Sequence, residues 1–247
     1  MPDVRNMTIE QVARLIDCQL VAHDSWDVAE FVDAARNIQK YNFGSVYVLP
    51  YRLSFARDLL GDYCKLNDVK LGSQVGLCAY TFWERYIEAK LEETEELIDK
   101  GATTLDMAID HRALTEGMYD KVQDDVSKFV ALCEEKHVVP KVIELVELMD
   151  DTSKIELTTR LIAEAGAKII KSSSEEVLQF GRPTVFDIAA MLKGAEGTGA
   201  KIMATGLYHP SSVYLYLNAG ACGVGTADGI KMAEALPMIQ KHIYGIQ

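Results

Sequence analysis

Short apolar runs, rich in β-branched residues, alternate with longer amphipathic segments from one end of the chain to the other. Runs of this kind predict strands, and a hydrophobic period of about 3.6 residues predicts helices. The clearest helical segments are Phe82–Lys100 and Met118–Lys136. The predicted strands are Leu15–Leu20, Ser45–Leu49, Leu71–Leu77, Thr103–Ile109, Val139–Val146, Ala167–Ser172, Ala200–Thr205 and Ala221–Gly225.

The order of these elements predicts the fold class. Eight strands, each followed by a helical segment, are typical of an α/β protein with a parallel sheet. A chain of 247 residues suits closure of that sheet into a single (β/α)8 TIM barrel, although a half-barrel or a doubly wound open sheet has a similar rhythm. No low-complexity linker divides the chain, so we expect residues 1–247 to form one domain.

A Gly-Ala pair recurs directly before several predicted strands. Each glycine follows a helical segment, at the position where a left-handed residue commonly ends a helix. This weak internal repeat supports a regular helix-to-strand unit. The pairs are Gly101-Ala102, Gly166-Ala167, Gly199-Ala200 and Gly220-Ala221.

Alternation within each strand separates a face that packs against helices from a face that points into the barrel. Leu105, Met107 and Ile109 share the apolar face of one strand, so Asp106 is expected inside. Ionised groups are rarely buried without partners, so the charged side chains placed inside predict either a structural ion-pair network or a catalytic cluster. The same test directs inward Asp17, Tyr47, Lys171, Lys201, Met203 and Thr205, and allows Lys141 there too.

Lys171 is the strongest catalytic candidate, because it ends its strand on the side where barrel enzymes build their active sites. A lysine attacks a carbonyl only when unprotonated, and its ordinary pKa is ~10.4. Burial and a second ammonium both lower that pKa. We therefore expect Lys141, on the preceding strand, to lower the pKa of Lys171, and Asp106 to relay a proton.

Composition excludes several other classes of function. A net charge of −12 argues against nucleic-acid and anionic-membrane partners, which require basic patches. The sequence holds no apolar run long enough to span a membrane and no signal-peptide pattern at its start. Five scattered cysteines and five histidines lack metal-ligand spacing, and no nucleotide-binding glycine motif occurs. We expect a cytoplasmic protein without a metal or cofactor.

The segment Ala167–Ser174 is similar to the Schiff-base strand of the deoxyribose-phosphate aldolase family, and four further patches follow the family order. The chain resembles these (β/α)8 class I aldolases over nearly its whole length. The resemblance implies Lys171 as nucleophile, Asp106 with a second lysine as proton relay, and a role in carbohydrate catabolism. The implied reaction is reversible cleavage of 2-deoxy-D-ribose 5-phosphate to glyceraldehyde 3-phosphate and acetaldehyde. The further patches are Tyr47–Pro50, Thr104–Met107, His111–Leu114 and Val139–Glu144.

The chain departs from the family pattern where the second lysine and the phosphate would be held. Met203 occupies the position of the relay lysine, and Lys201 lies one layer deeper on the same face. Glu175 and Glu176 replace a Gly-Lys pair, while His209 stands for the arginine of the next loop. Lys141 is therefore the better candidate for the second catalytic lysine.

The sequence thus predicts a class I aldolase, a carbon–carbon lyase, with Lys171, Asp106 and Lys141 as catalytic residues. Its substrate is an aldehyde or sugar phosphate, either the family substrate or a related aldol with or without phosphate. A catalytically impaired barrel kept as a binding or regulatory partner is the alternative, and a homodimer is allowed. The predicted substrate-binding residues are Asp17, Tyr47, Ser172, Thr205, Gly206, His209, Gly223, Gly225 and Thr226.

Overall fold

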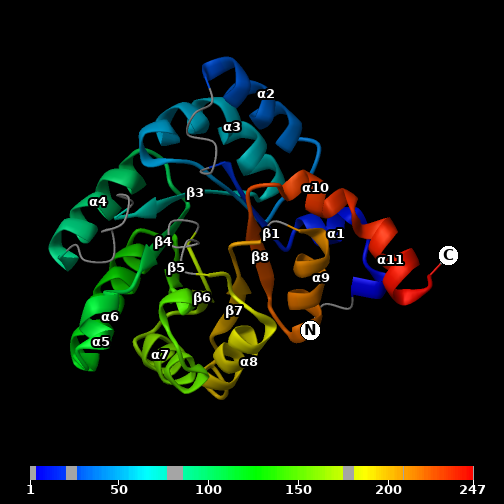
Figure 1. Ribbon diagram of the computed structural model, residues 1–247. Coiled ribbons are helices and arrows are strands. Elements are labelled where there is room, and N and C mark those ends of the chain that lie inside the picture. Colours follow the sequence, from blue (N-terminus) through cyan, green and yellow to red (C-terminus); the bar gives the residue numbers. More distant parts are fainter. Residues whose placement is uncertain (1–3, 21–26, 77–85, 175–180, 208, 247) are drawn as a thin grey trace.

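The structure, a computed structural model, describes residues 4–20, 27–76, 86–174, 181–207 and 209–246. Within these residues, eight parallel strands follow one another around a closed barrel, and the last strand pairs with the first (Figure 1). Closure confirms the predicted (β/α)8 TIM barrel and excludes the half-barrel and the open sheet. The strands are β1 (Ile16–Gln19), β2 (Ser45–Tyr47), β3 (Lys70–Val75), β4 (Thr104–Ala108), β5 (Val139–Ile143), β6 (Ile169–Lys171), β7 (Lys201–Ala204) and β8 (Gly223–Thr226).

Helices lie outside the barrel and cover the outward faces of the strands (Figure 1). Outward residues such as Val46, Leu105 and Val142 are fully buried, which explains the apolar alternate positions of the strands. The short 3-10 helices are η1 (Val4–Asn6), η3 (Pro50–Arg52) and η5 (Val146–Leu148). The α-helices are α1 (Ile9–Ala13), α2 (Val28–Ile38), α3 (Leu53–Asn67), α4 (Ile87–Asp99), α5 (His111–Thr115), α6 (Tyr119–Glu135), α7 (Thr152–Glu164), α8 (Val185–Gly194), α9 (Pro210–Ala219), α10 (Gly229–Glu234) and α11 (Leu236–Tyr244).

The predicted elements match the observed ones in order and type, but most extend past them. The predicted strand Val139–Val146 is longer than β5, because Leu145 adopts a left-handed φ of 61° and leads into η5. The predicted helix Met118–Lys136 corresponds to α6 within one residue at each end. The predicted helix Phe82–Lys100 corresponds to α4, whereas residues 77–85, which include its start and the end of one predicted strand, lie outside the described residues.

The glycines of the Gly-Ala repeat adopt the conformation that the sequence predicts. The φ angles of Gly101, Gly166, Gly199 and Gly220 are 105°, 104°, 81° and 117°, all in the left-handed region. A residue with a Cβ rarely adopts such angles, and Gly101, Gly166 and Gly220 end α4, α7 and α9, whereas Gly199 lies five residues after the end of α8, in the turn before β7. The repeat is therefore a structural signal of the barrel.

The strand register places polar residues from distant parts of the chain on neighbouring strands of the barrel. Asp106 is the Cα partner of Lys141, and Lys171 is the partner of Ile143 on one side and Met203 on the other. Inward side chains of a closed eight-stranded barrel fill its interior in layers. The inward side chains of β1, β4, β5 and β6 are therefore directed toward the barrel axis.

The two ends of the described chain lie side by side (Figure 1). In α11, Gln240 Nε2 donates to Val4 O at 3.2 Å and to Met7 O at 2.9 Å, which ties the last helix to the first turn. No helix in the described part of the chain is long and apolar enough to cross a membrane. The assignment of residues 1–247 to a single domain stays a prediction.

Candidate active site

Lys171 and Asp106 form the centre of a buried cluster inside the barrel. Both side chains are fully buried, and the Lys171 ammonium donates a hydrogen bond to Asp106 Oδ2. Lys171 ends β6, and Asp106 lies in the middle of β4. The predicted inward direction of both residues is therefore confirmed.

Asp17 on β1 connects this pair to a second lysine. Its Oδ2 accepts from Lys141 Nζ at 2.6 Å and from Lys171 Nζ at 3.4 Å, and its Oδ1 accepts from the Ser45 hydroxyl. The side chains of Lys141 and Asp17 are 6% and 3% exposed. Two carboxylates therefore balance two ammonium groups, and the inward positions of Asp17 and Lys141 are confirmed.

Tyr47 lies against both lysines from β2. Its ring centroid is 4.6 Å from Lys171 Nζ and 5.2 Å from Lys141 Nζ, which is within cation–π range. Its hydroxyl donates to Asp106 Oδ1 and lies 3.1 Å from Thr104 Oγ1. The ring fits because a Cβ on Gly72 would come within 2.8 Å of it. Tyr47 therefore holds Asp106 and packs against the two ammonium groups.

The electrostatic setting of Lys171 differs from the predicted one. Burial acts to lower the pKa of Lys171, but the adjacent carboxylates of Asp106 and Asp17 outweigh it and raise the pKa above its ordinary value. The predicted lowering of the Lys171 pKa is therefore wrong, because two carboxylates, those of Asp106 and Asp17, contact its ammonium group. Burial also disfavours ionisation of Asp17, but Lys141 and Lys171 lower the pKa of its carboxyl.

The strand beside Lys171 supplies no second catalytic lysine. Met203 is the Cα partner of Lys171 and is buried. Lys201, which the sequence places inside the barrel, is exposed at the start of β7, so that expectation is wrong. The strand begins at the amino-terminal mouth of the barrel, where a long side chain extends into solvent.

Ser172 and Thr205 use their hydroxyls to hold β6 and β7 together. Ser172 Oγ accepts from Thr205 N at 3.0 Å, while Thr205 Oγ1 accepts from Ser173 N at 2.8 Å and donates to Ser173 O. These bonds fix the backbone directly after Lys171. The predicted contact of both residues with substrate stays a prediction.

The remaining predicted residues fall into two groups. Gly206, with φ at 80°, and Thr226, whose hydroxyl donates to Leu207 O at 2.7 Å, lie at the carboxyl ends of β7 and β8. The exposed His209 caps α9 instead, because its Nδ1 accepts from Ser211 N. Gly223 begins β8 and packs on Leu15 O and Met203, so the structure does not bring it to the carboxyl end. Glu175 and Glu176 lie outside the described residues.

Gln19 is a site residue that the sequence reasoning missed. It lies two residues beyond Asp17 on the same face of β1 and is 2% exposed. A Cβ on Gly225 would come within 3.2 Å of Gln19 Nε2 and 2.6 Å of Thr205 Cγ2, so Gly225 makes room for both side chains. The alternation that places Asp17 inside also places Gln19 inside, and this signal was available in the sequence.

Glu144, which directly follows β5, is fully buried, and Glu147 is half-buried, and in the part of the chain that the structure describes neither forms an ion pair. Burial raises the pKa of Glu144 well above its ordinary value, although the hydroxyl of Thr159 donates to it at 2.6 Å. Burial also raises the pKa of Glu147 to about 8, and the Ser173 hydroxyl donates to this carboxyl. Both carboxyls are therefore harder to ionise than an exposed glutamate.

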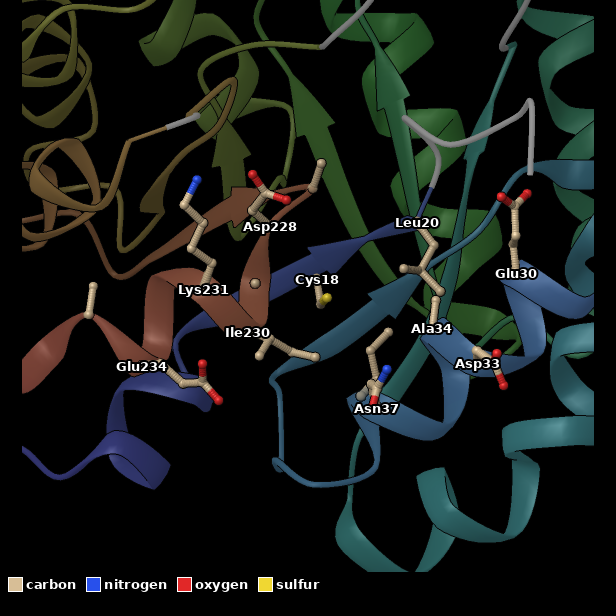
Figure 2. A pocket seen from close by; sticks show the side chains of 14 residues that line it. Cys18, Leu20, Glu30, Asp33, Ala34, Asn37, Asp228, Ile230, Lys231 and Glu234 are labelled. Carbon is tan, nitrogen blue, oxygen red and sulfur yellow. The ribbon is translucent and has the colours of Figure 1, made fainter. Parts of the chain in front are cut away.

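A hollow of about 790 Å³ lies elsewhere, between α2 and α10 (Figure 2). It is lined by Cys18, on the face of β1 opposite to Asp17, and by residues such as Asp33 and Lys231. It does not contain the Lys171 cluster, and we place the active site inside the barrel instead. Among the described residues, no group of three His, Cys, Asp or Glu side chains is arranged to hold a metal ion.

No family model matches the chain, but individual proteins do. The deoxyribose-phosphate aldolase of Thermococcus gammatolerans is 32% identical over 208 residues, which cover 84% of this chain and 88% of the relative. The deoxyribose-phosphate aldolase of Bacteroides thetaiotaomicron is 27% identical over 243 residues, covering 97% and 96%.

A solved structure agrees with this similarity at the level of the fold. The tetrameric deoxyribose phosphate aldolase of Aeropyrum pernix matches with a TM-score of 0.78 and 24% identity, covering 94% of this chain and 93% of that one. At this identity the likeness shows the shared barrel alone. The sequence relatives, which match most of the chain, carry the more specific conclusion.

Proposed function

This chain belongs to the deoxyribose-phosphate aldolase family, and on that premise we propose that it is a class I aldolase that uses Lys171 as its nucleophile. The reaction is the reversible cleavage of 2-deoxy-D-ribose 5-phosphate, or of a related aldol, to an aldehyde and acetaldehyde. The observation that carries this proposal is the direct contact between Lys171 and Asp106 inside the barrel. A nucleophilic amine beside a carboxylate is the pairing that iminium chemistry requires.

In this proposal, Asp106 takes the proton that the Lys171 ammonium must lose before its amine attacks C1 of the substrate. Asp106 returns that proton to the departing water as the iminium forms. The ionised carboxylate then accepts the proton of the C3 hydroxyl, the C2–C3 bond breaks, and its electron pair forms the enamine. Protonation of C2 and hydrolysis of the iminium release acetaldehyde and restore Lys171.

Lys141 acts in this scheme as a positioning residue. Its ion pair with Asp17 keeps a second carboxylate 3.4 Å from Lys171, in addition to that of Asp106. Tyr47 holds the other oxygen of Asp106, so both carboxylates have fixed orientations. Fixed groups of this kind lower the reorganisation that the reaction requires.

Arg182 is the candidate for binding a phosphate group of the substrate. The exposed Arg182 donates to Gly206 O at 3.5 Å, which places a cation beside the loop after β7. If the substrate carries a phosphate there, Arg182→Ala raises the KM for deoxyribose 5-phosphate and leaves that for deoxyribose unchanged. Equal KM changes for both substrates would show that Arg182 does not bind the phosphate.

Borohydride trapping tests the nucleophile directly. The protein is incubated with acetaldehyde, and borohydride reduces the imine that forms. The adduct is then located by peptide mass mapping. We expect one adduct on Lys171 that is lost in Lys171→Ala and retained in Lys201→Met, a matched change at an exposed lysine of the next strand. No adduct in the native protein, or an adduct that survives Lys171→Ala, would remove the proposal.

A second candidate is an impaired aldolase that serves as a binding or regulatory partner. Its support is Met203, an apolar side chain beside Lys171 at the position where the family resemblance implies a relay lysine. Turnover of deoxyribose 5-phosphate at ~1–10³ per second, as in ordinary enzymes, would exclude this candidate. Trapping on Lys171 without measurable turnover would favour it.

Assembly and location form the last part of the proposal. We infer a homo-oligomer, since the Aeropyrum relative is described as tetrameric, and light scattering distinguishes a dimer from a tetramer. We also infer the cytoplasm, because Cys18, Cys64, Cys133 and Cys222 are free thiols, which persist in a reducing compartment. Cell fractionation tests the location.

A further inference from the structure

Gln19 presents an unpaired polar atom inside the barrel. Its Oε1 is buried and has no hydrogen-bond partner in the part of the chain that the structure describes. A buried acceptor without a partner is uncommon in native proteins, because burial removes its bonds to water. Such an atom, two residues beyond Asp17 on the same inward face of β1, indicates a place where a ligand supplies the missing donor.

The position of Gln19 follows from the strand register. Asp17, whose carboxylate is 3.4 Å from Lys171 Nζ, and Gln19 share the inward face of β1. Two residues along a strand span ~6–7 Å, so Gln19 lies that far above Asp17, toward the carboxyl end of the barrel. Substrate enters a barrel enzyme from that end. A chain attached to Lys171 therefore extends past Gln19.

The chemistry of the amide limits what the partner can be. Oε1 only accepts hydrogen bonds, so its partner must be a donor, and an ionised phosphate or carboxylate is excluded. The Thr205 methyl and Gly225 lie next to the amide and add no donor of their own. A hydroxyl of the substrate meets these requirements, since it donates to Oε1 and also accepts from Nε2.

We propose that Gln19 is a specificity-determining residue that binds the C4 hydroxyl of the aldol substrate. The inference rests on the proposed function, in which C1 is bonded to Lys171 and the C3 hydroxyl gives its proton to Asp106. The C4 carbon is four bonds from Nζ, about 5 Å in an extended chain with single bonds of ~1.5 Å. The C4 hydroxyl is therefore the next polar group within reach of Gln19.

The test compares two aldehydes that differ at C4. Deoxyribose carries a hydroxyl there, whereas 3,5-dihydroxypentanal carries only hydrogen at C4 and keeps the hydroxyls of C3 and C5. The readout is the aldehyde concentration that gives half-maximal borohydride adduct, summed over intact substrate and acetaldehyde adducts. This readout requires imine formation but no turnover, so it applies to a slow enzyme too.

We expect Gln19→Met, which keeps the length of the side chain, to raise this concentration for deoxyribose about 10- to 100-fold. The value for 3,5-dihydroxypentanal should change less than about threefold, as should both values in Gln39→Leu, an exposed control at the end of α2. If Gln19→Met does not fold, Gln19→Ala, which adds no bulk, repeats the comparison.

The outcomes separate this inference from the proposed function. The role of Gln19 is overturned if both aldehydes form the adduct but the Gln19 variants change the half-maximal concentration equally for both, or for neither. Lys171 then remains the nucleophile. Absence of any adduct in the native protein overturns the nucleophile, and the inference about Gln19 falls with it. A half-maximal concentration that rises for deoxyribose alone supports both the role of Gln19 and Lys171 as nucleophile.

Discussion

Met203 is the Cα partner of Lys171, so a buried apolar residue lies level with Lys171 on the neighbouring strand. On its other sides Lys171 contacts Asp106 and Asp17, both of which are carboxylates. The nearby charges are therefore balanced in a way that favours the protonated lysine. This relationship determines how the site should respond to pH and to substitution.

Met203→Lys should shift the reactivity of Lys171 to lower pH. A second ammonium on the neighbouring strand disfavours protonation of Lys171 and lowers its pKa. We expect the midpoint of the pH profile for borohydride trapping to fall by about one unit or more, with some loss of stability from the added buried charge. Met203→Leu is the control with a similar volume. An unchanged profile in Met203→Lys would contradict the assignment of Met203 to this neighbourhood.

Asp106→Asn should separate imine formation from turnover. Removal of the carboxylate that most strongly raises the pKa of Lys171 lowers that pKa, so trapping should begin at lower pH than in the native protein. Cleavage of the aldol should fall about 10²- to 10⁴-fold, because the proton relay is lost. The measurements are the trapping profile and acetaldehyde release. A variant that keeps native turnover would show that another group relays the proton.

Asp17→Ala should destabilise the protein strongly. The change leaves Lys141 without its ion pair and Lys171 with only one carboxylate, and loss of one partner from a buried pair costs about 3–5 kcal/mol. Denaturation in urea measures the free energy of unfolding. Asp33→Ala is the control, since Asp33 forms an exposed pair with Arg36 and should cost less than about 1 kcal/mol. Similar losses in both variants would argue against a buried network.

Glu144 and Glu147 should make the protein less stable as the pH rises. The pKa of Glu147 is raised from 4.5 to about 8, so between these values the folded state binds more protons than the unfolded state. Stability from this group is complete below pH 4.5 and is lost as the pH passes 8, at up to about 1.4 kcal/mol per pH unit. Ionisation of Glu144 lowers stability in the same direction, since burial raises its pKa as well.

Urea denaturation between pH 5 and pH 8 checks this dependence. Glu147→Gln removes one titrating group and should flatten the fall in unfolding free energy across that range. A control substitution of the exposed Glu135 should leave the slope unchanged. A slope that Glu147→Gln does not alter would show that Glu147 ionises as freely in the folded protein as in the unfolded chain.

The sequence by itself determined the order of the strands and the faces of their residues. A period of two in a strand is set by local geometry, so the inward directions of Asp17, Asp106 and Lys171 follow from the apolar residues on either side. The left-handed glycines of the Gly-Ala repeat are local in the same sense. Gln19 was open to the same reasoning, because it shares the parity of Asp17.

The tertiary structure decided which of these groups meet. Asp17 is 154 residues from Lys171 and 124 from Lys141, and only closure of the barrel brings its carboxylate between the two lysines. The sign of the pKa shift at Lys171 depends on distances across the barrel, which a strand pattern does not contain. Likewise, Lys201 has the inward parity but lies at the open amino-terminal end, where depth along the axis, and not parity, decides exposure.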